Sequence, residues 1–245
     1  MGYLSREEKN YLNRTPKSAD MQDRAIKYLP GGSSRDASFF EPYPIFIEYG
    51  EGSYIYDVDG NQYLDFMINA TSLILGHSHP EIVNALKKQI EIGLSFSAPT
   101  DAQIILAKTL TERIPSIEKI RFTNSGTEAT EASIKIARKY FHAIGKPEKN
   151  RIITFQGAFH GRTLAALFSA NNPKHTEGFG PKVDGFDQVP FGDHEATKKA
   201  INKNTAAIMI ETIMGEGGIK VVPDFCIKGL KESVSYTHLT LPTKA

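Results

Sequence analysis

Three short polar stretches of this sequence carry residue types that could bind a small anionic ligand. In the first, Ser125, Gly126 and Thr127 stand between a β-branched run, residues 119–123, and a segment with apolar residues at helical spacing. A strand, a small-residue turn and a helix in this order form an anion site, because the first N–H groups of a helix lack intrahelical partners and its dipole favours negative charge. Glycine lets a ligand approach the backbone, and the two hydroxyls can add donors.

The same stretch also fits the start of a helix that binds no ligand. Ser125 and Glu128 match the S-x-x-E capping box, in which each side chain accepts a hydrogen bond from a backbone amide. The turn matches neither G-x-G-x-x-G nor G-x-x-x-x-G-K-[ST], which argues against a dinucleotide or Walker-type site. This stretch alone leaves both interpretations open.

Phe159 and Arg162 lie in the second stretch, AFHGRT, shortly after an apolar run that predicts a strand over residues 151–155. In an open parallel sheet, ligands bind beyond the carboxyl ends of the strands, where the first two stretches would meet. There an aromatic ring can stack on a planar cofactor, and an arginine can bind a carboxylate through two parallel hydrogen bonds. Taken singly, a phenylalanine is usually core and an arginine is usually a solvated surface residue.

Glu211 and Glu216 form the third stretch, after the apolar run 206–210, which predicts another strand. Both carboxylates therefore fall at the same edge of the sheet. Paired carboxylates can serve a glycosidase, but nothing in the sequence fixes their separation near the distances that this chemistry needs.

The histidines at 77 and 79 have H-x-H spacing, which is compatible with a metal site. Catalytic zinc needs three protein ligands, and no further Cys/His cluster accompanies His77 and His79. We therefore expect no metal here and a loop histidine that hydrogen-bonds the backbone.

Hydrophobic periodicity predicts the elements that hold these stretches. Residues 1–29 form a polar arm or leading helix, and three short strands over 45–48, 53–58 and 62–66 form an antiparallel meander. Helices are expected from Pro80, from Thr100 with a Thr100–Gln103 capping box, after Gly126, around residues 195–201 and from Asp224. Strands that alternate with helices predict an α/β fold, a mostly parallel sheet with flanking helices, plus a small N-terminal α+β segment.

Composition excludes several classes of function. The chain has 245 residues and a formal net charge of +1 with interspersed acids and bases, so no basic stripe indicates nucleic acid. No apolar run reaches the roughly 18 residues of a membrane span, and the polar first residues do not resemble a signal peptide. The single cysteine, Cys226, excludes an internal disulfide and is expected to be buried packing in a helix. We expect a cytoplasmic protein.

Four motifs, LGHSHPEI, NSGTEATEA, AFHGRT and ETIMGEGG, occur in this order, and together they resemble the class III aminotransferases, pyridoxal-phosphate enzymes of fold type I. The resemblance covers about residues 28–231. It implies that the cofactor is pyridoxal 5'-phosphate and that Ser125, Gly126 and Thr127 hold its phosphate. It also implies that Phe159 stacks on the pyridine ring and that Arg162 binds a substrate carboxylate.

The third motif implies roles for two carboxylates. Glu216 matches the residue that in several family members pairs with an arginine further along the chain and switches between amino donors. Glu211 would support the site from behind, without touching the ligand. Thr212 stands where the family usually has proline, a departure that concerns loop geometry rather than chemistry.

Within the family, the N-terminal and C-terminal halves of the resemblance differ. The N-terminal half is more similar to glutamate-1-semialdehyde aminomutase, and the C-terminal half is more similar to acetylornithine and ornithine aminotransferases. Arg162 favours an aminotransferase that acts between an ω-amino or acetylated diamino acid and a 2-oxo acid, in a parent enzyme that is a homodimer. The aminomutase and a non-catalytic phosphate-binding module remain alternatives, whereas the missing G-x-G-x-x-G disfavours a nicotinamide-dependent dehydrogenase.

The resemblance also implies two residues that this chain does not supply in their family context. They are a lysine that forms the Schiff base and an aspartate that pairs with the pyridine nitrogen, so we assign no catalytic residue and expect an inactive fragment. Residues 234–243 have no family counterpart and resemble a translated sequencing adaptor. We expect part of a small domain over 1–66, an incomplete large cofactor-binding domain over 67–233 and a non-native tail over 234–245. The strand at 206–210 would then have an unpaired apolar edge and lower the solubility.

Overall fold

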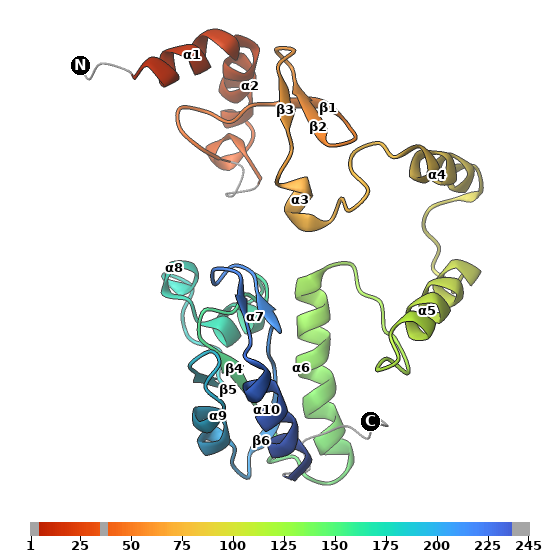
Figure 1. The fold of residues 1–245 in the computed structure, drawn as a ribbon, viewed down its shortest axis with the longest axis vertical. Helices are drawn as coiled ribbons and strands as arrows, with labels where there is room; N and C mark the ends of the chain where they lie inside the picture. Colours follow the sequence, from red (N-terminus) through yellow and green to blue (C-terminus); the bar gives the residue numbers. More distant parts are fainter. Residues whose placement is uncertain (1–4, 35–38, 237–245) are drawn as a thin grey trace. The chain divides into compact units, whose positions relative to one another are not determined.

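The computed structural model describes residues 5–34 and 39–236 (Figure 1). By its internal contacts the chain divides into two compact units, Met1–Pro99 and Thr100–Ala245. The boundary that the sequence predicts at residue 66 stays a prediction. Within the described residues, no helix is both long and apolar enough to cross a membrane.

The first unit contains a small antiparallel sheet, as the sequence predicts, with strand order β1-β2-β3. Its elements are α1 (Arg6–Arg14), α2 (Pro16–Ile26), a 3-10 turn (Pro30–Gly32), β1 (Ile47–Glu51), β2 (Tyr54–Asp57), β3 (Gln62–Leu64), α3 (Ile68–Thr71) and α4 (Pro80–Ile92). The first strand begins two residues later than expected. Asp59, in the turn between β2 and β3, accepts hydrogen bonds from the backbone amides of Lys17 and Ser18 and so caps the start of α2.

The second unit is a parallel α/β layer structure. Its elements are α5 (Asp101–Arg113), α6 (Gly126–Ala143), β4 (Arg151–Phe155), α7 (Leu164–Ala170), α8 (Pro173–Thr176), β5 (Phe186–Val189), α9 (His194–Ala200), β6 (Thr205–Ile208), β7 (Ile213–Met214), β8 (Lys220–Val221) and α10 (Asp224–Tyr236). In the described sheet the order is β5-β4-β6, and both pairs are parallel. The mostly parallel α/β fold that the sequence predicts is therefore confirmed.

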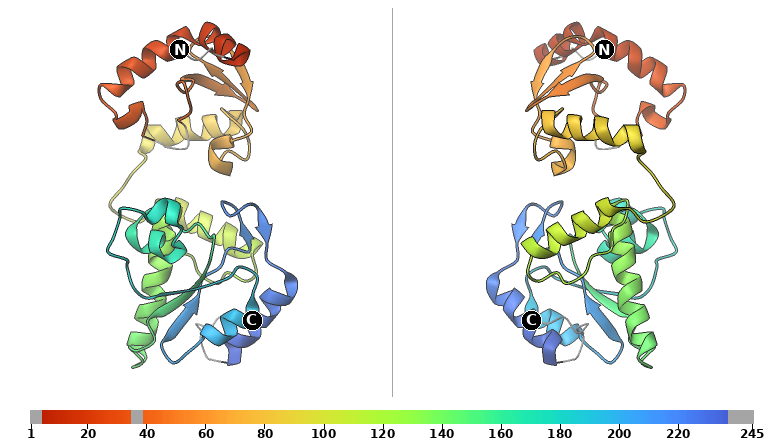
Figure 2. Two further views of the ribbon diagram at one scale, coloured as in Figure 1. Left: turned by 90° about the vertical axis from the view of Figure 1, so that its left-hand side faces the viewer. Right: turned by 90° about the vertical axis from the view of Figure 1, so that its right-hand side faces the viewer.

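Helices cover both faces of this sheet (Figure 2). Successive residues of β4 point to opposite faces, so Ile152 packs with Ile134 of α6 on one side, while Ile153 and Phe155 pack on the other side. On that second side lies Cys226 of α10, which is fully buried, as expected of a packing residue. Each fully buried β4 side chain stabilises the unit by about 1.5–3 kcal/mol.

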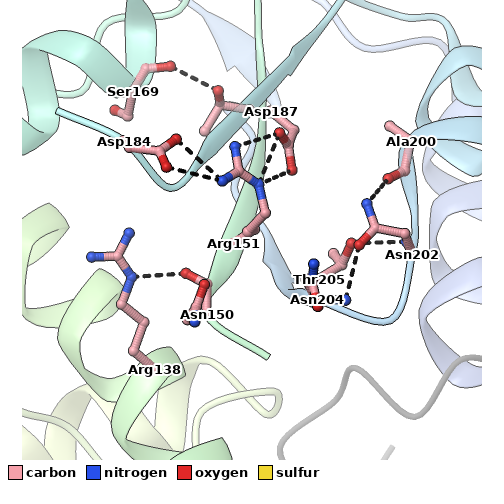
Figure 3. A network of polar contacts seen from close by, with 11 residues as sticks. Arg138, Asn150, Arg151, Ser169, Asp184, Asp187, Ala200, Asn202, Asn204 and Thr205 are labelled. Atoms are coloured by element: carbon pink, nitrogen blue, oxygen red, sulfur yellow. Dashed lines mark hydrogen bonds and ion pairs between the residues drawn. The ribbon is translucent and has the colours of Figure 1, made fainter. Parts of the chain in front are cut away.

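A network of polar contacts holds the amino ends of the strands together (Figure 3). Arg151, the first residue of β4, donates to both carboxylate oxygens of Asp187 on β5, at 2.9 Å and 2.8 Å for the shortest bond to each, and to Asp184 at 3.1 Å. Arg138 of α6 donates through Nε to the carbonyl of Asn150 at 2.9 Å. These contacts fix the end of the sheet opposite the carboxyl ends where a ligand is expected.

Two local predictions are wrong. Residues 119–123 form no strand, because a strand requires a hydrogen-bonded neighbour and no described strand pairs with this run; Phe122 is 42% exposed. Thr100 does precede α5, but its side chain makes no capping hydrogen bond, so the expected capping box with Gln103 is absent. Of the expected non-native tail, residues 234–236 continue α10, and residues 237–245 lie outside the described residues.

Candidate active site at the carboxyl ends of the strands

The start of α6 offers unpaired backbone donors beside open space. Ser125 is the N-cap residue, and its Oγ accepts a hydrogen bond from the amide of Glu128 at 3.2 Å. The Glu128 carboxylate accepts from the amide of Asn124 at 2.6 Å, so the predicted capping box is present with its second bond displaced by one residue. The amides of Gly126 and Thr127 have no acceptor within the helix, by its geometry. No heavy atom lies within 4 Å of a Cβ placed on Gly126, which leaves room for a ligand.

Gly161 brings the AFHGRT loop against this helix start. Its φ is +121°, and a Cβ at this position would lie 2.8 Å from the Cβ of Thr127. Only glycine fits such a close approach with such a backbone angle. Thr163, two residues further, donates a hydrogen bond through Oγ1 to the Glu131 carboxylate of α6. The loop therefore contacts α6 at two successive turns.

Phe159 and Arg162 lie on this loop with their side chains close together. The Arg162 guanidinium carbon is 5.6 Å from the centre of the Phe159 ring, and the ring makes an edge contact with His175 at 6.3 Å between centroids. Phe159 is half-buried and Arg162 is exposed. Among the described residues no carboxylate forms an ion pair with Arg162. A flat ring and an accessible cation thus stand beside the start of α6.

Glu211 connects the second and third stretches. Its Oε1 accepts a hydrogen bond from the Phe159 amide at 2.6 Å, and its Oε2 accepts from the Gly215 amide at 3.2 Å. A Cβ on Gly217 would lie 2.7 Å from the carbonyl oxygen of Gly157, so the two loops also touch through their backbones. This carboxylate acts on the backbone that carries Phe159. Glu216, by contrast, is exposed in the turn between β7 and β8.

His160 is buried, and it lies between two residues of the candidate site in sequence. Only 8% of the residue is exposed, and its Nε2 has no hydrogen-bond partner among the described residues. Burial lowers the pKa of His160, and the negative charge of Glu211 opposes this shift. At neutral pH the imidazole is therefore uncharged.

Four residues that build this geometry were not predicted from the sequence: His160, Gly161, Thr163 and Glu131. Gly161 had a signal, since a glycine between an aromatic residue and an arginine marks a position where the backbone approaches another segment. Glu131 and Thr127 also had one, because residues four apart lie on the same face of a helix. The bond between Glu131 and Thr163 depends on how α6 is rotated about its axis, which no local pattern indicates.

The histidines in the first unit serve local structure. His77 Nε2 lies 2.7 Å from Asp65 Oδ2, and its backbone pairs with Gly52, so the ring binds a carboxylate rather than the backbone. The hydrogen bond from His77 and those from the amides of Ile68 and Met67 lower the pKa of Asp65, against a smaller opposing effect of burial. Over residues 5–34 and 39–236, no three His, Cys, Asp or Glu side chains gather as a metal site.

The arrangement suits a planar cofactor that carries a phosphate. The open space at Gly126 and the helix amides fit the phosphate, and the loop that Gly161 holds against Thr127 places the Phe159 ring at the same edge. Arg162 can accept a carboxylate from a second molecule bound next to the ring.

Comparison with known proteins agrees with this geometry. The sequence profile of the family described as Aminotransferase class-III matches residues 37–238. An acetylornithine aminotransferase from Agrobacterium fabrum is 51% identical over 181 residues, which are 72% of this chain and 45% of that protein. A glutamate-1-semialdehyde 2,1-aminomutase from Methanocaldococcus jannaschii is 37% identical over 236 residues, 92% of this chain and 54% of that protein.

Solved structures give the same assignment. An omega-transaminase from Sphaerobacter thermophilus superposes with a TM-score of 0.84 at 33% identity, over 94% of this chain and 55% of that one. A transaminase with PLP bound gives a TM-score of 0.80 at 31% identity, over 91% of this chain and 54% of that one. The chain spans about half the length of these relatives. Their fold is fold type I and pyridoxal phosphate is the cofactor of the family. The chain belongs to the class III aminotransferase family.

Proposed function

We propose that the whole protein is a pyridoxal-phosphate-dependent aminotransferase that moves an amino group between an ω-amino or acetylated diamino acid and a 2-oxo acid. The observation that carries this proposal is the approach of Gly161 to Thr127, which brings the Phe159–Arg162 loop to the start of α6. The 51% identity to an acetylornithine aminotransferase, the higher of the two relatives compared, supports the substrate class.

Each residue has a distinct part in this proposal. The amides and hydroxyls of Ser125, Gly126 and Thr127 bind the cofactor phosphate, and the Phe159 ring lies against the pyridine ring. When bound, pyridoxal phosphate supplies the electron-withdrawing ring on which amino transfer depends. Arg162 binds and orients the substrate carboxylate.

The two glutamates act at different distances from the ligand. Glu211 holds the Phe159 backbone in place through its 2.6 Å hydrogen bond. Glu216, which is exposed on its turn, is available to a cationic partner such as the arginine that the family resemblance implies.

We also propose that the 245 residues alone bind phosphate without transferring amino groups. The lysine that holds the cofactor covalently and the aspartate that protonates its ring belong to none of the matched motifs of this chain. The whole protein is proposed to be a cytoplasmic homodimer, the location following from its use of a single cysteine.

The phosphate assignment is tested by filling the space at Gly126. Gly126→Leu adds a side chain where no atom lies within 4 Å, so the fold should persist while pyridoxal phosphate binding falls at least about tenfold. Ser133→Leu, at an exposed position further along α6, is the matched control and should bind as the parent does. Binding is measured by fluorescence titration together with the unfolding midpoint. Equal affinity of both variants would remove the phosphate from this helix start.

The carboxylate assignment separates the alternatives. Arg162→Ala should weaken binding of dicarboxylates such as glutarate while leaving pyridoxal phosphate affinity unchanged. A non-catalytic phosphate-binding module would show phosphate binding with no effect of Arg162→Ala. The aminomutase alternative, which the 37% identity over 92% of the chain keeps open, would be favoured if the whole enzyme turned over glutamate semialdehyde without a 2-oxo acid.

A further inference from the structure

One face of α6 contacts the loop on both sides of Arg162. Gly161 packs on Thr127, and Thr163 donates a hydrogen bond to Glu131. Thr127 and Glu131 are four residues apart, so their side chains lie one above the other on the same face of the helix. Arg162, the residue between these two contacts, is thereby held at both of its neighbours.

The Thr163 hydroxyl is used in an unusual way for its position. Thr163 is the N-cap residue of α7 and has the extended backbone (φ −72°, ψ 158°) from which a threonine commonly caps a helix. No side-chain capping bond forms at α7, and the hydroxyl donates to the half-buried Glu131 instead. The start of α7 is left without this cap, while the loop is fastened to α6.

The consequence concerns the direction of the Arg162 side chain. An arginine with four side-chain torsions loses much conformational freedom when it binds a carboxylate in a bidentate geometry, and a fixed backbone reduces that cost. The helix that holds the loop is the same helix whose first amides face the phosphate space. A single rigid element therefore sets the separation between the phosphate site and the carboxylate site.

We propose that Glu131 is a positioning residue for carboxylate recognition, acting on Arg162 through the hydroxyl of Thr163. This inference rests on the proposed function, because it takes Arg162 as the carboxylate-binding residue. Glu131 touches neither the phosphate nor the carboxylate ligand. Its effect is to hold the Arg162–Thr163 backbone in the orientation that presents the guanidinium beside Phe159.

The first measurement is trypsin cleavage of the Arg162–Thr163 bond in the folded chain. Loss of the hydrogen bond in Glu131→Ala or Thr163→Val should accelerate this cleavage about tenfold, because proteolysis follows the population of the opened loop. Thr163→Ser keeps the hydroxyl and Glu131→Gln keeps the acceptor oxygen, so both should cleave within about twofold of the parent. Glu148→Ala removes a carboxylate from an exposed position outside the loop and is the matched control.

The second measurement is ligand binding by NMR on the same variants. Glutarate is titrated while the Arg162 Nε–H resonance is followed, and inorganic phosphate is titrated while the Gly126 amide is followed. Glu131→Ala and Thr163→Val should each weaken glutarate binding about five- to tenfold and leave phosphate binding within about twofold. The double variant should show no further loss, because both changes remove the same bond.

The outcomes separate this inference from the proposed function. Unchanged glutarate affinity in Glu131→Ala overturns the positioning role, as does equal loss of glutarate binding, phosphate binding and thermal stability, which would indicate a general structural role. A Glu131→Gln variant that behaves as Glu131→Ala would also overturn it, since charge rather than the hydrogen bond would then matter. If the parent chain binds no glutarate, or if Arg162→Ala leaves that binding unchanged, the assignment of Arg162 fails and the positioning role fails with it, whatever the trypsin result.

Discussion

Replacing Gly161 by alanine should destabilise the second unit and distort the candidate site. The residue has a φ of +121°, a region that costs a non-glycine residue about 1–3 kcal/mol. A Cβ there would also lie 2.8 Å from the Cβ and 2.9 Å from the Cγ2 of Thr127, and such overpacking costs about 1–3 kcal/mol. We expect a loss of roughly 4 kcal/mol, the sum of mid-range values, from a total unfolding free energy of about 5–15 kcal/mol.

Gly178→Ala is the matched control for backbone strain. Gly178 also has a positive φ, +79°, but no heavy atom lies within 4 Å of a Cβ placed on it. Its substitution should cost only the conformational part, about 1–2 kcal/mol. Urea unfolding compares the two variants, and adding Thr127→Ala to Gly161→Ala should recover part of the difference by removing the nearest side-chain atoms. If the two glycine variants had the same unfolding free energy, the packing of the loop on α6 would be refuted.

Three further predictions concern other residues of the second unit. Glu211→Gln should lower the unfolding free energy by about 1–2 kcal/mol and weaken pyridoxal phosphate binding, because an amide group cannot accept from both backbone N–H groups that the carboxylate now binds; urea melts and cofactor titration measure this. Burial lowers the pKa of His160 below its ordinary 6.5, so protonation favours the unfolded chain and stability should fall as the pH drops below about 6.5; His160→Gln should lack this part of the pH profile, and an unchanged profile would contradict the assignment. Burial raises the pKa of the fully buried Cys226 thiol, so iodoacetamide should label it only on unfolding, and rapid labelling of the native chain would show that α10 does not cover it.

The elements with strong local signals could be predicted from the sequence. Strand β4 was predicted with its observed bounds, and α9 and β6 to within two residues, because apolar periodicity and flanking breaks are clear there. Strand β5 was missed because its central residues, Asp187 and Gln188, are polar. Their partners lie far along the chain: Asp187 binds Arg151, and Gln188 donates to the carbonyl of Ser169. A polar residue paired at long range gives no hydrophobic pattern.

The candidate site shows the same division between local and long-range signals. The order of strands and turns predicted that Thr127, Phe159 and Glu211 would come to one edge, and the contacts of Gly161 with Thr127 and of Glu211 with the Phe159 amide bring them there. The strand predicted at residues 119–123 is absent, so the position of α6 does not depend on it in the described sheet. The roles of these residues toward a ligand stay predictions.

The contacts imply that ligand-binding side chains and loop-holding residues can be told apart by experiment. Arg162 is exposed, and its contact with the Phe159 ring at 5.6 Å is worth only about 0.5–1 kcal/mol at such a site. Removing its side chain should therefore change ligand affinity with little effect on unfolding. Gly161 and Glu211 act on the backbone, where the same reasoning gives about 4 and 1–2 kcal/mol. A residue that contacts the ligand directly should thus lower affinity far more than stability, whereas one that holds the loop should lower both, and this ratio identifies its role without a bound ligand in view.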